Sequence, residues 1–283
     1  MSRIKVTYKN FGQVIAMTVV IVSLLTVSCE EKSDHPLPNQ QINTIVVDGM
    51  LTNELKRQEI RLSKPFSDPN QNREPVTGAV VTVIVDGLTV PFIESTEEPG
   101  LYQTSQPAAA TIDKTYHLQI ESAGETYTAS TYMIPIAAPN QPTFQYVPDT
   151  GLYQIQWNNP EYSPFETAMY EADISWGHLP AYTNDSLTKA RLTFYTLNTI
   201  DVSYIIFPQD KEEVYFPYGS IAILKKYSLT DEYAAYLRAL LAETEWQGSI
   251  FEDARGNLPS NISNGGLGYF SACSVIADTV VVE

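Results

Sequence analysis

Two stretches of strand-like sequence, each interrupted by a tight turn, constrain the fold of this chain most strongly. The first is a β-prone run over residues 75–85, followed by Asp86-Gly87 and a second apolar run over residues 88–90. An Asp-Gly pair between apolar runs favours a β-hairpin, because both turn positions need positive φ. We therefore expect a hairpin here. Pro91 lacks an N–H, so we expect its arm at a sheet edge.

The second stretch alternates apolar and polar residues with a period of two. Residues 116–120 and 127–133 show this alternation on either side of a turn at residues 122–125. A period of two with one apolar face predicts a half-buried antiparallel sheet. His117 falls on the polar face, and we interpret it as a solvated residue.

Short strands separated by turn signals are typical of a β-sandwich. We expect an immunoglobulin-like β-sandwich over residues 42–137, with early strands at residues 45–47 and 59–62 and a turn at Asp48-Gly49. The composition changes at the proline-containing segment 136–142, which we interpret as a domain boundary.

A second β domain is expected over residues 138–283. Its strands at residues 152–158 and 168–176 resemble the opening strands of a fibronectin type III module. A single amphipathic helix is expected near residues 230–246, because Thr230 can cap it and an apolar stripe follows at helical spacing. We expect this stripe to pack on the second sheet. Further strands are expected at residues 191–196, 203–207, 213–217 and 220–225.

The N-terminus has the layout of a secretory signal peptide, predicted here as residues 1–28. Arg3, Lys5 and Lys9 precede an apolar run over residues 14–25, and small residues follow. As a helix, this run rises about 18 Å, against a hydrocarbon core of roughly 30 Å. Plain secretion and an uncleaved anchor are the alternatives.

A cysteine lies directly at the predicted cleavage site. Residues 26–29 resemble the bacterial lipobox, although Thr26 occupies the position where most lipoboxes have Leu. We predict that Cys29 is lipidated, and that its two or three acyl chains, such as palmitate, anchor the protein stably. Cys273 is then the sole thiol of the mature chain, and we expect it to be buried and inert.

Residues 29–41 are predicted to form a lipidated tether. Glu30 and Glu31 resemble the export signal of Bacteroidota-type lipoproteins, which favours display on the outer face of the outer membrane. A solvated spacer, and a location on the periplasmic face, are the alternatives. Two prolines then break the polar segment that leads to the first strand.

The chain carries 17 basic and 33 acidic side chains among 283 residues, a formal net charge of −16. This balance argues against nucleic-acid binding, because phosphate would be repelled. Two cysteines are too few for a disulfide scaffold or a cysteine metal cluster. The 18 tyrosines suit half-buried sandwich positions, or alternatively a contact surface for a protein or a sugar.

We find no catalytic pattern, metal-ligand spacing or cofactor motif, and we expect a protein that is not an enzyme. The three histidines, His35, His117 and His178, are widely separated in the sequence. Acidic pairs occur at residues 97–98, 212–213 and 252–253, and a carboxylate-based surface hydrolase remains the least favoured alternative. Ser186 and Thr279 lie in three-residue patterns that resemble O-glycosylation acceptors.

Scattered motifs together resemble the Bacteroidota outer-membrane lipoprotein family called "domain of unknown function 4249". They include the lipobox, the strands at residues 45–52 and 61–63, the run at residues 75–81, and the segment 265–272. The resemblance implies a surface accessory protein of a TonB-dependent outer-membrane transporter that helps to capture or retain an unknown cargo. The alternative function is a structural or adhesive surface lipoprotein.

Overall fold

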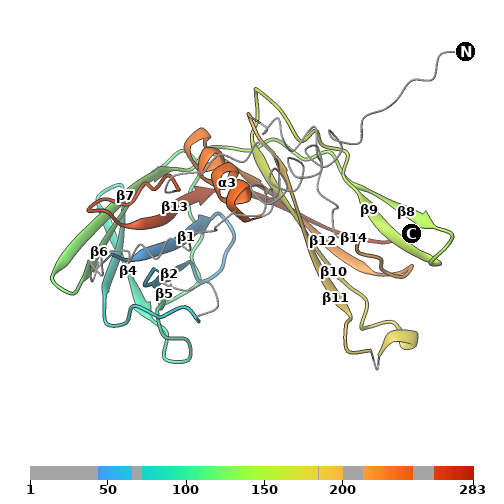
Figure 1. The fold of residues 1–283 in the computed structure, drawn as a ribbon, viewed down its shortest axis with the longest axis horizontal. Coiled ribbons are helices and arrows are strands. Elements are labelled where there is room, and N and C mark those ends of the chain that lie inside the picture. The colour runs from blue at the N-terminus through green and yellow to red at the C-terminus, as the bar shows by residue number, and fades with distance from the viewer. Residues whose placement is uncertain (1–43, 66–71, 184, 200–212, 245–257) are drawn as a thin grey trace, which may run out of the picture. The chain divides into compact units, whose positions relative to one another are not determined.

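The computed structural model describes residues 44–65, 72–183, 185–199, 213–244 and 258–283. All of them belong to one compact unit, Asn43–Glu283. This unit is mainly β, with one α-helix near the C-terminus (Figure 1), and the expected fold class is thereby confirmed. Within the described ranges, no helix is long and apolar enough to cross a membrane.

Eight strands form the first sheet, in the order β13-β1-β2-β5-β4-β3-β6-β7. Neighbouring strands are antiparallel, except that β1 and β13 run parallel. The parallel pairing of β1 with β13 starts at Val46 opposite Leu267 and continues to Thr52 opposite Cys273. The strands are β1 (Val46–Thr52), β2 (Glu59–Ser63), β3 (Val80–Val85), β4 (Leu88–Glu94), β5 (Leu101–Thr104), β6 (Thr115–Ser122), β7 (Glu125–Tyr132) and β13 (Leu267–Cys273).

The two edges of the first sheet approach each other and enclose a hydrophobic core. Just before β13, the backbone N–H of Ser263 donates to the carbonyl oxygen of Thr128 on β7 at 2.8 Å. The backbone N–H of Thr128 in turn donates to Oγ of Ser263 at 2.7 Å. The core inside contains fully buried Ile60, Leu118 and Phe270. This arrangement fits a sandwich or a barrel.

Both expected hairpins form where their turn residues predict them. Asp86 (φ 49°) and Gly87 (φ 77°) join β3 to β4, and Ala123 (φ 52°) and Gly124 (φ 84°) join β6 to β7. The predicted sheet edge at Pro91 is wrong, because β4 lies between β3 and β5. Pro91 is tolerated because the pairing of β4 with β5 begins only at the next residue.

The turn expected at Asp48-Gly49 is also wrong, since both residues lie inside β1. A Cβ at Gly49 would lie 3.2 Å from side-chain atoms of Ile60 and Phe270. The glycine therefore serves close packing between neighbouring strands here, and tertiary packing overrides the local turn signal.

A second sheet of four strands has the order β11-β10-β12-β14, and every neighbouring pair is antiparallel. A separate two-stranded sheet, β8 with β9, packs apolar side chains against one face of it. The buried part of this second core includes Ile174, Trp176 and Phe216. The strands are β8 (Thr143–Val147), β9 (Leu152–Gln156), β10 (Ala168–Ser175), β11 (Lys189–Thr196), β12 (Ile221–Ser228) and β14 (Val275–Val281).

Most strands expected in this half of the chain form, with three differences. Residues 213–217 contribute only an isolated bridge between Phe216 and Tyr153. The strand expected at residues 203–207 lies outside the described residues. The segment expected as the second domain also returns to the first sheet, since β13 pairs with β1 before β14 pairs with β12.

The helix α3 (Asp231–Thr244) begins and ends close to the predicted bounds. Oγ1 of Thr230 accepts a hydrogen bond from the backbone N–H of Tyr233 at 3.3 Å, which is an N-cap contact. The apolar side of the helix buries Leu237 and Leu241 in a cluster that also contains Tyr227 of β12 and Tyr269 of β13. The helix therefore packs on both sheets, where we expected the second sheet alone. A short 3₁₀-helix, η1 (Pro180–Tyr182), precedes β11.

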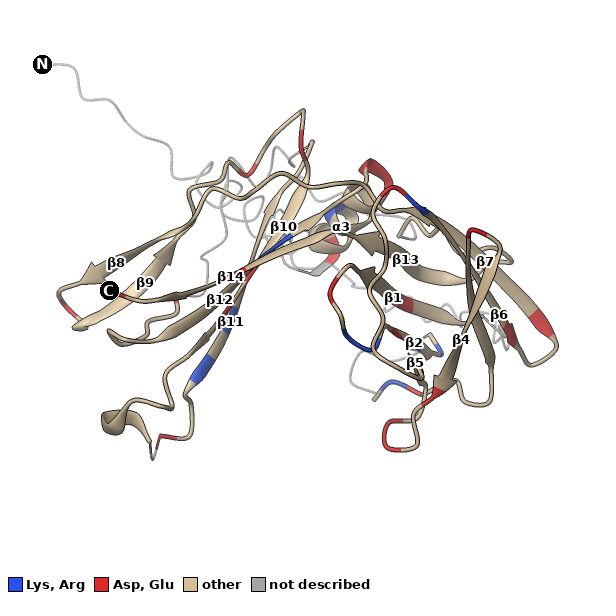
Figure 2. Ribbon diagram, turned by 180° about the vertical axis from the view of Figure 1, so that it is seen from behind, with Lys and Arg blue, Asp and Glu red and all other residues tan. Residues whose placement is uncertain are grey.

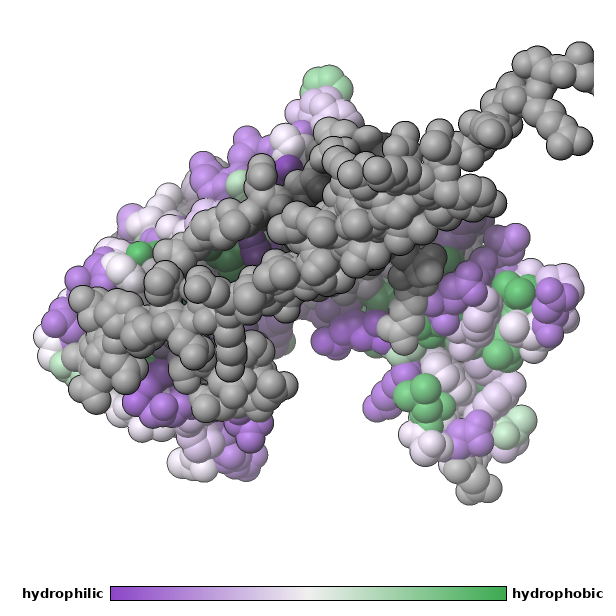
Figure 3. All heavy atoms as spheres, in the orientation of Figure 1, coloured by the Kyte–Doolittle hydropathy of each residue, from purple (hydrophilic) through white to green (hydrophobic). Residues whose placement is uncertain are grey.

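Charged and apolar side chains are distributed unevenly over this framework. Figure 2 shows acidic residues mostly in the turns and loops, with basic residues on β11 and β12 of the second sheet. On the face seen in Figure 3, green apolar residues form small separate groups among hydrophilic ones. Scattered exposed apolar residues are normal on a protein surface, so each needs a local argument before a function is attached to it.

Candidate functional site

The residues predicted to be modified lie far apart in the chain. Cys29, the predicted lipidation site, lies outside the described residues. Ser186 is exposed in the loop before β11, and Thr279 is exposed on β14. Both hydroxyls are accessible to a modifying enzyme, and their glycosylation stays a prediction.

The histidines and acidic pairs singled out in the sequence do not converge where they are described. Nδ1 of His117 contacts Oγ of Ser130 at 2.8 Å, as expected for a residue on the solvated face. Nε2 of His178 contacts the carbonyl oxygen of Gly219 at 3.1 Å. His35 lies outside the described residues. Within the described ranges, no three His, Cys, Asp or Glu side chains form a group that could hold a metal ion.

The acidic pairs behave as surface groups where they are described. Glu98 forms an ion pair with Arg61 at 2.7 Å, and the backbone N–H of Glu97 donates to Oγ of Ser95. Glu213 accepts a hydrogen bond from the hydroxyl of Tyr215. Residues 212, 252 and 253 lie outside the described residues. The described contacts hold these carboxylates in local surface interactions.

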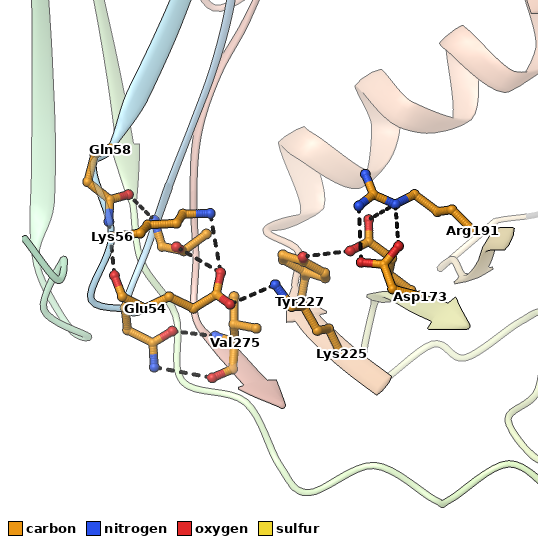
Figure 4. Close-up of polar contacts among 11 residues, drawn as sticks. Glu54, Lys56, Gln58, Asp173, Arg191, Lys225, Tyr227 and Val275 are labelled. Carbon is orange, nitrogen blue, oxygen red and sulfur yellow. Dashed lines mark hydrogen bonds and ion pairs between the residues drawn. The ribbon is translucent and has the colours of Figure 1, made fainter. Parts of the chain in front are cut away.

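A line of polar contacts, here named the polar junction, connects the two sheets (Figure 4). Its centre is Glu54, which follows β1 and accepts a hydrogen bond from Nζ of Lys225 on β12 at 2.8 Å. Only 24% of the Glu54 side chain and 22% of the Lys225 side chain are exposed. Partial burial opposes ionisation of Glu54, but the hydrogen bond from Lys225 and the charges of Lys56 and Lys225 together lower its pKa.

Asn53 adds a two-way contact beside this ion pair. Its Oδ1 accepts from the backbone N–H of Val275 at 2.6 Å, and its Nδ2 donates to the carbonyl oxygen of Val275 at 3.3 Å. Gln58 supports the segment from the other side by donating to the carbonyl oxygen of Glu54 at 3.1 Å. The Asn53 side chain, which follows β1, is thereby fixed against the first residue of β14.

The junction continues along the face of the second sheet that carries Glu171, Asp173 and Tyr227. The hydroxyl of Tyr227 donates to Oε1 of Glu171 at 3.3 Å, and Arg191 binds both carboxylate oxygens of Asp173, at 2.6 and 3.0 Å. Burial raises the pKa of Tyr227 far above its ordinary value, and the charges of Glu171 and Glu54 add to this effect. Tyr227 therefore stays a neutral hydrogen-bond donor at physiological pH.

A small cleft of about 20 Å³ lies beside Lys225. Its walls come from the segment 139–142, from Trp157 directly after β9, and from β10, β12 and β14. Trp157 supplies an aromatic wall and stacks on Phe194, with ring centroids 5.6 Å apart and planes at 19°. The lining residues are Pro139, Asn140, Gln141, Pro142, Trp157, Tyr170, Leu224, Lys225, Ile276 and Asp278.

Hydrogen bonds hold the rim of this cleft in place. Nε2 of Gln141 donates to Oδ2 of Asp278 at 3.1 Å, and Nδ2 of Asn158 donates to the carbonyl oxygen of Gln141 at 2.8 Å. A cavity of this size has room for about one water molecule, with amides and a carboxylate at its edge. The cleft is therefore a small dent in the second sheet and too small to enclose an organic ligand.

The buried thiol and the tyrosines near α3 show no sign of chemical activation. Burial raises the pKa of the Cys273 thiol to about 12 and that of Tyr269 to about 12. Tyr233 and Tyr236 of α3 and Tyr269 of β13 lie with ring centroids 4.9–6.1 Å apart. Cys273 is buried, as predicted, and a thiol that stays protonated is a poor nucleophile.

Sequence reasoning missed both the polar junction and the cleft. Glu54 and Lys225 lie 171 positions apart, and no local pattern marks either residue as a partner of the other. The proline-containing segment 139–142 was recognised only as a boundary, whereas it lines the cleft. Trp157, within the strand expected at residues 152–158, is the one available signal.

Comparison with known proteins places the chain in a family without assigning an activity. No significant match is found among curated proteins. Residues 30–278, which are most of the chain, match the protein family described as a domain of unknown function (DUF4249). The chain therefore belongs to the DUF4249 family.

Proposed function

We propose that the protein is an outer-membrane lipoprotein of the Bacteroidota type that acts as an accessory, cargo-binding partner of a TonB-dependent transporter. The observation that supports this proposal best is where the family match begins. It starts at residue 30, directly after Cys29. The region shared with the family thus excludes the positively charged and apolar segment that resembles a lipoprotein signal peptide.

The architecture of the described residues is compatible with a binding role. The first strand, β1, begins at Val46, about fifteen residues after Cys29, and an extended chain of that length spans at most about 50 Å. The folded unit then offers several exposed apolar side chains. In this proposal the anchor supplies proximity to the transporter, and the folded unit supplies contacts to cargo or transporter.

Replacing the proposed anchor tests the location. The full chain with Cys29→Ser keeps the export segment but loses the lipidated thiol, and Cys273→Ser serves as the matched cysteine control. We expect the wild type and the control to sediment with the outer membrane, and Cys29→Ser to move to the soluble fraction. Retention of Cys29→Ser in the membrane fraction at the wild-type level would exclude lipid anchoring at this residue.

Purification from native membranes tests the partnership. An affinity-tagged wild-type chain, extracted in mild detergent, is expected to bring down a TonB-dependent transporter, and the soluble Cys29→Ser chain is expected to recover less of it. Deleting the gene should also reduce uptake of the cargo. If no transporter co-purifies and deletion alters only surface attachment, the adhesive function replaces this one.

A further inference from the structure

The connection between β9 and β10 carries an aromatic tip that the folded unit leaves uncovered. Phe165 is 95% exposed, more than any other large apolar side chain among the described residues, and nearby Tyr162 is 49% exposed. Moving a phenylalanine side chain from water into an apolar environment is favourable by about 1.5–3 kcal/mol. An exposed aromatic of this kind therefore offers substantial binding free energy to a partner that covers it.

The backbone around Phe165 is held in one conformation. Oγ of Ser163 accepts hydrogen bonds from the backbone N–H groups of Phe165 and Glu166, at 3.3 and 3.2 Å. Pro164, between Ser163 and Phe165, has a fixed φ. A serine side chain that bonds the backbone two and three residues further on closes a local turn. The tip is therefore already ordered in the free protein.

The base of the connection is bonded to the second sheet. The backbone N–H of Leu197 donates to the carbonyl oxygen of Glu161 at 2.9 Å, and the N–H of Ser163 donates to the carbonyl oxygen of Leu197 at 2.9 Å. Oγ1 of Thr167 donates to the carbonyl oxygen of Leu229 at 2.7 Å. Ordering costs on binding are small when a contact residue is held in advance. This is the property of an anchor residue and not of a flexible loop.

Acidic residues surround the tip. Glu161 and Glu166 flank it in the sequence, and Figure 2 shows acidic residues in the connection that precedes β10. Asp231 and Glu232 begin α3 close by, since Nδ2 of Asn198 donates to Oδ1 of Asp231 at 3.1 Å. Nζ of Lys226 contacts Glu166 at 2.7 Å, and this lysine is 97% buried within the fold.

This charge distribution selects among partners. Carboxylates beside an apolar tip, even with one of them paired to Lys226, complement an apolar pocket with a rim of Lys and Arg. An anionic lipid surface would repel the carboxylates and is disfavoured. Aromatic residues that fill a pocket within a charged or polar rim are also the usual centres of protein–protein interfaces.

We propose that Phe165 is the central anchor of a docking surface, formed with Tyr162 and the flanking acidic residues, that inserts into a basic-rimmed apolar pocket of the transporter. This inference rests on the proposed function for the identity of the partner. It adds the surface that makes the contact and the chemistry of the pocket that receives it.

Site-specific photocrosslinking in native membranes tests the docking surface. The photoreactive residue p-benzoylphenylalanine replaces Phe165 in the full chain. The control replaces Leu88, which is 66% exposed on the β3–β4 hairpin of the first sheet. We expect a crosslink to the transporter from position 165 and none from position 88. In parallel, Phe165→Ser should lower the recovered transporter about tenfold or more, and Phe165→Trp should restore most of it.

The outcomes separate this inference from the proposed function. If the wild-type chain recovers the transporter, but Phe165→Ser recovers as much and position 165 does not crosslink to it, the docking surface is wrong and the partnership stands. A crosslink from position 165 to lipid alone also overturns the docking surface. If the wild type recovers no transporter, the proposed function fails, and the inference fails with it. Equal thermal unfolding temperatures for the wild type and Phe165→Ser verify that the variant is folded.

Discussion

Nζ of Lys225 on β12 lies 2.8 Å from Oε1 of Glu54, which follows β1, and this ion pair joins the second sheet to the first. Both side chains are about three-quarters buried. A pair in such a position is sheltered from much of the solvent screening that weakens ion pairs at the surface. Its partners also lie on different sheets, so its loss affects the way the sheets are held together.

Removing one partner of this pair should destabilise the protein. We expect Lys225→Met to lower the free energy of unfolding by about 1–3 kcal/mol, because Glu54 is left partly buried without its closest donor. Lys64→Met, at the exposed pair with Glu74, should cost less than about 1 kcal/mol. Urea unfolding of both variants measures the difference, and equal losses would show that the junction contributes no more than a surface pair.

The same pair predicts how stability depends on acid pH. The pKa of Glu54 is lowered below its ordinary value of 4.5 in the folded state. The contribution of ionised Glu54 to the free energy of unfolding is therefore fully present above pH 4.5, and it is lost as the pH falls through the pKa of Glu54 in the folded state. The stability difference between the wild type and Glu54→Gln should be constant from pH 7 to 5 and should shrink below pH 4.5. A difference that grows on acidification would contradict this assignment.

A glycine on β13 is required by close approach of two backbones. Gly268 has a φ of 82°, and a Cβ there would lie 2.0 Å from the carbonyl oxygen of Val47 on β1. We expect Gly268→Ala to cost more than about 3 kcal/mol or to prevent folding. Gly87→Ala is the matched control, because Gly87 has a φ of 77° with nothing within 4 Å. It should cost only about 1 kcal/mol, from backbone strain. Thermal unfolding of both variants checks the contrast.

The buried thiol supplies a probe of global unfolding. Burial raises the pKa of Cys273 to about 12, so the folded protein at pH 8 presents a protonated, inaccessible thiol. In a chain with Cys29→Ser, a thiol reagent at pH 8 should modify Cys273 only as fast as the protein unfolds, and at once in denaturant. Fast modification of the folded chain would show local opening around β13.

The raised pKa values also predict sensitivity to strong alkali. The neutral forms of Cys273 and Tyr269 are favoured in the folded state. Their contribution to the free energy of unfolding is therefore complete below their ordinary pKa values of 9.0 and 10.0. It is lost as the pH rises through the folded values near 12. Circular dichroism at fixed urea should therefore show declining stability above pH 9. In Cys273→Ser the decline should begin about one pH unit later.

Features set by neighbouring residues were predictable from the sequence. The β3–β4 hairpin follows from Asp86-Gly87, because the turn needs residues that tolerate positive φ. Helix α3 follows from the Thr230 cap and the apolar stripe. The same dipeptide at Asp48-Gly49 misleads, because contacts with β2 and β13 decide its conformation.

Features set by long-range contacts were not predictable in this way. Strand β5 (Leu101–Thr104) has only four residues, and besides the preceding β4 it pairs with the distant β2. The parallel pairing of β1 with β13 joins residues more than 200 positions apart. The solvent exposure of Phe165 was also not predictable, because the local sequence around an aromatic residue does not show whether the fold buries it or leaves it in water.

The position of β13 and β14 sets an order on assembly. Strand β1 is synthesised early. Its parallel partner β13 and the edge strand of the second sheet, β14, both come from residues 267–281. Neither sheet can be completed until that stretch has been synthesised, so earlier strands wait with unpaired edges. Shortening the chain by a few dozen residues at this end would therefore remove a strand from each sheet at once.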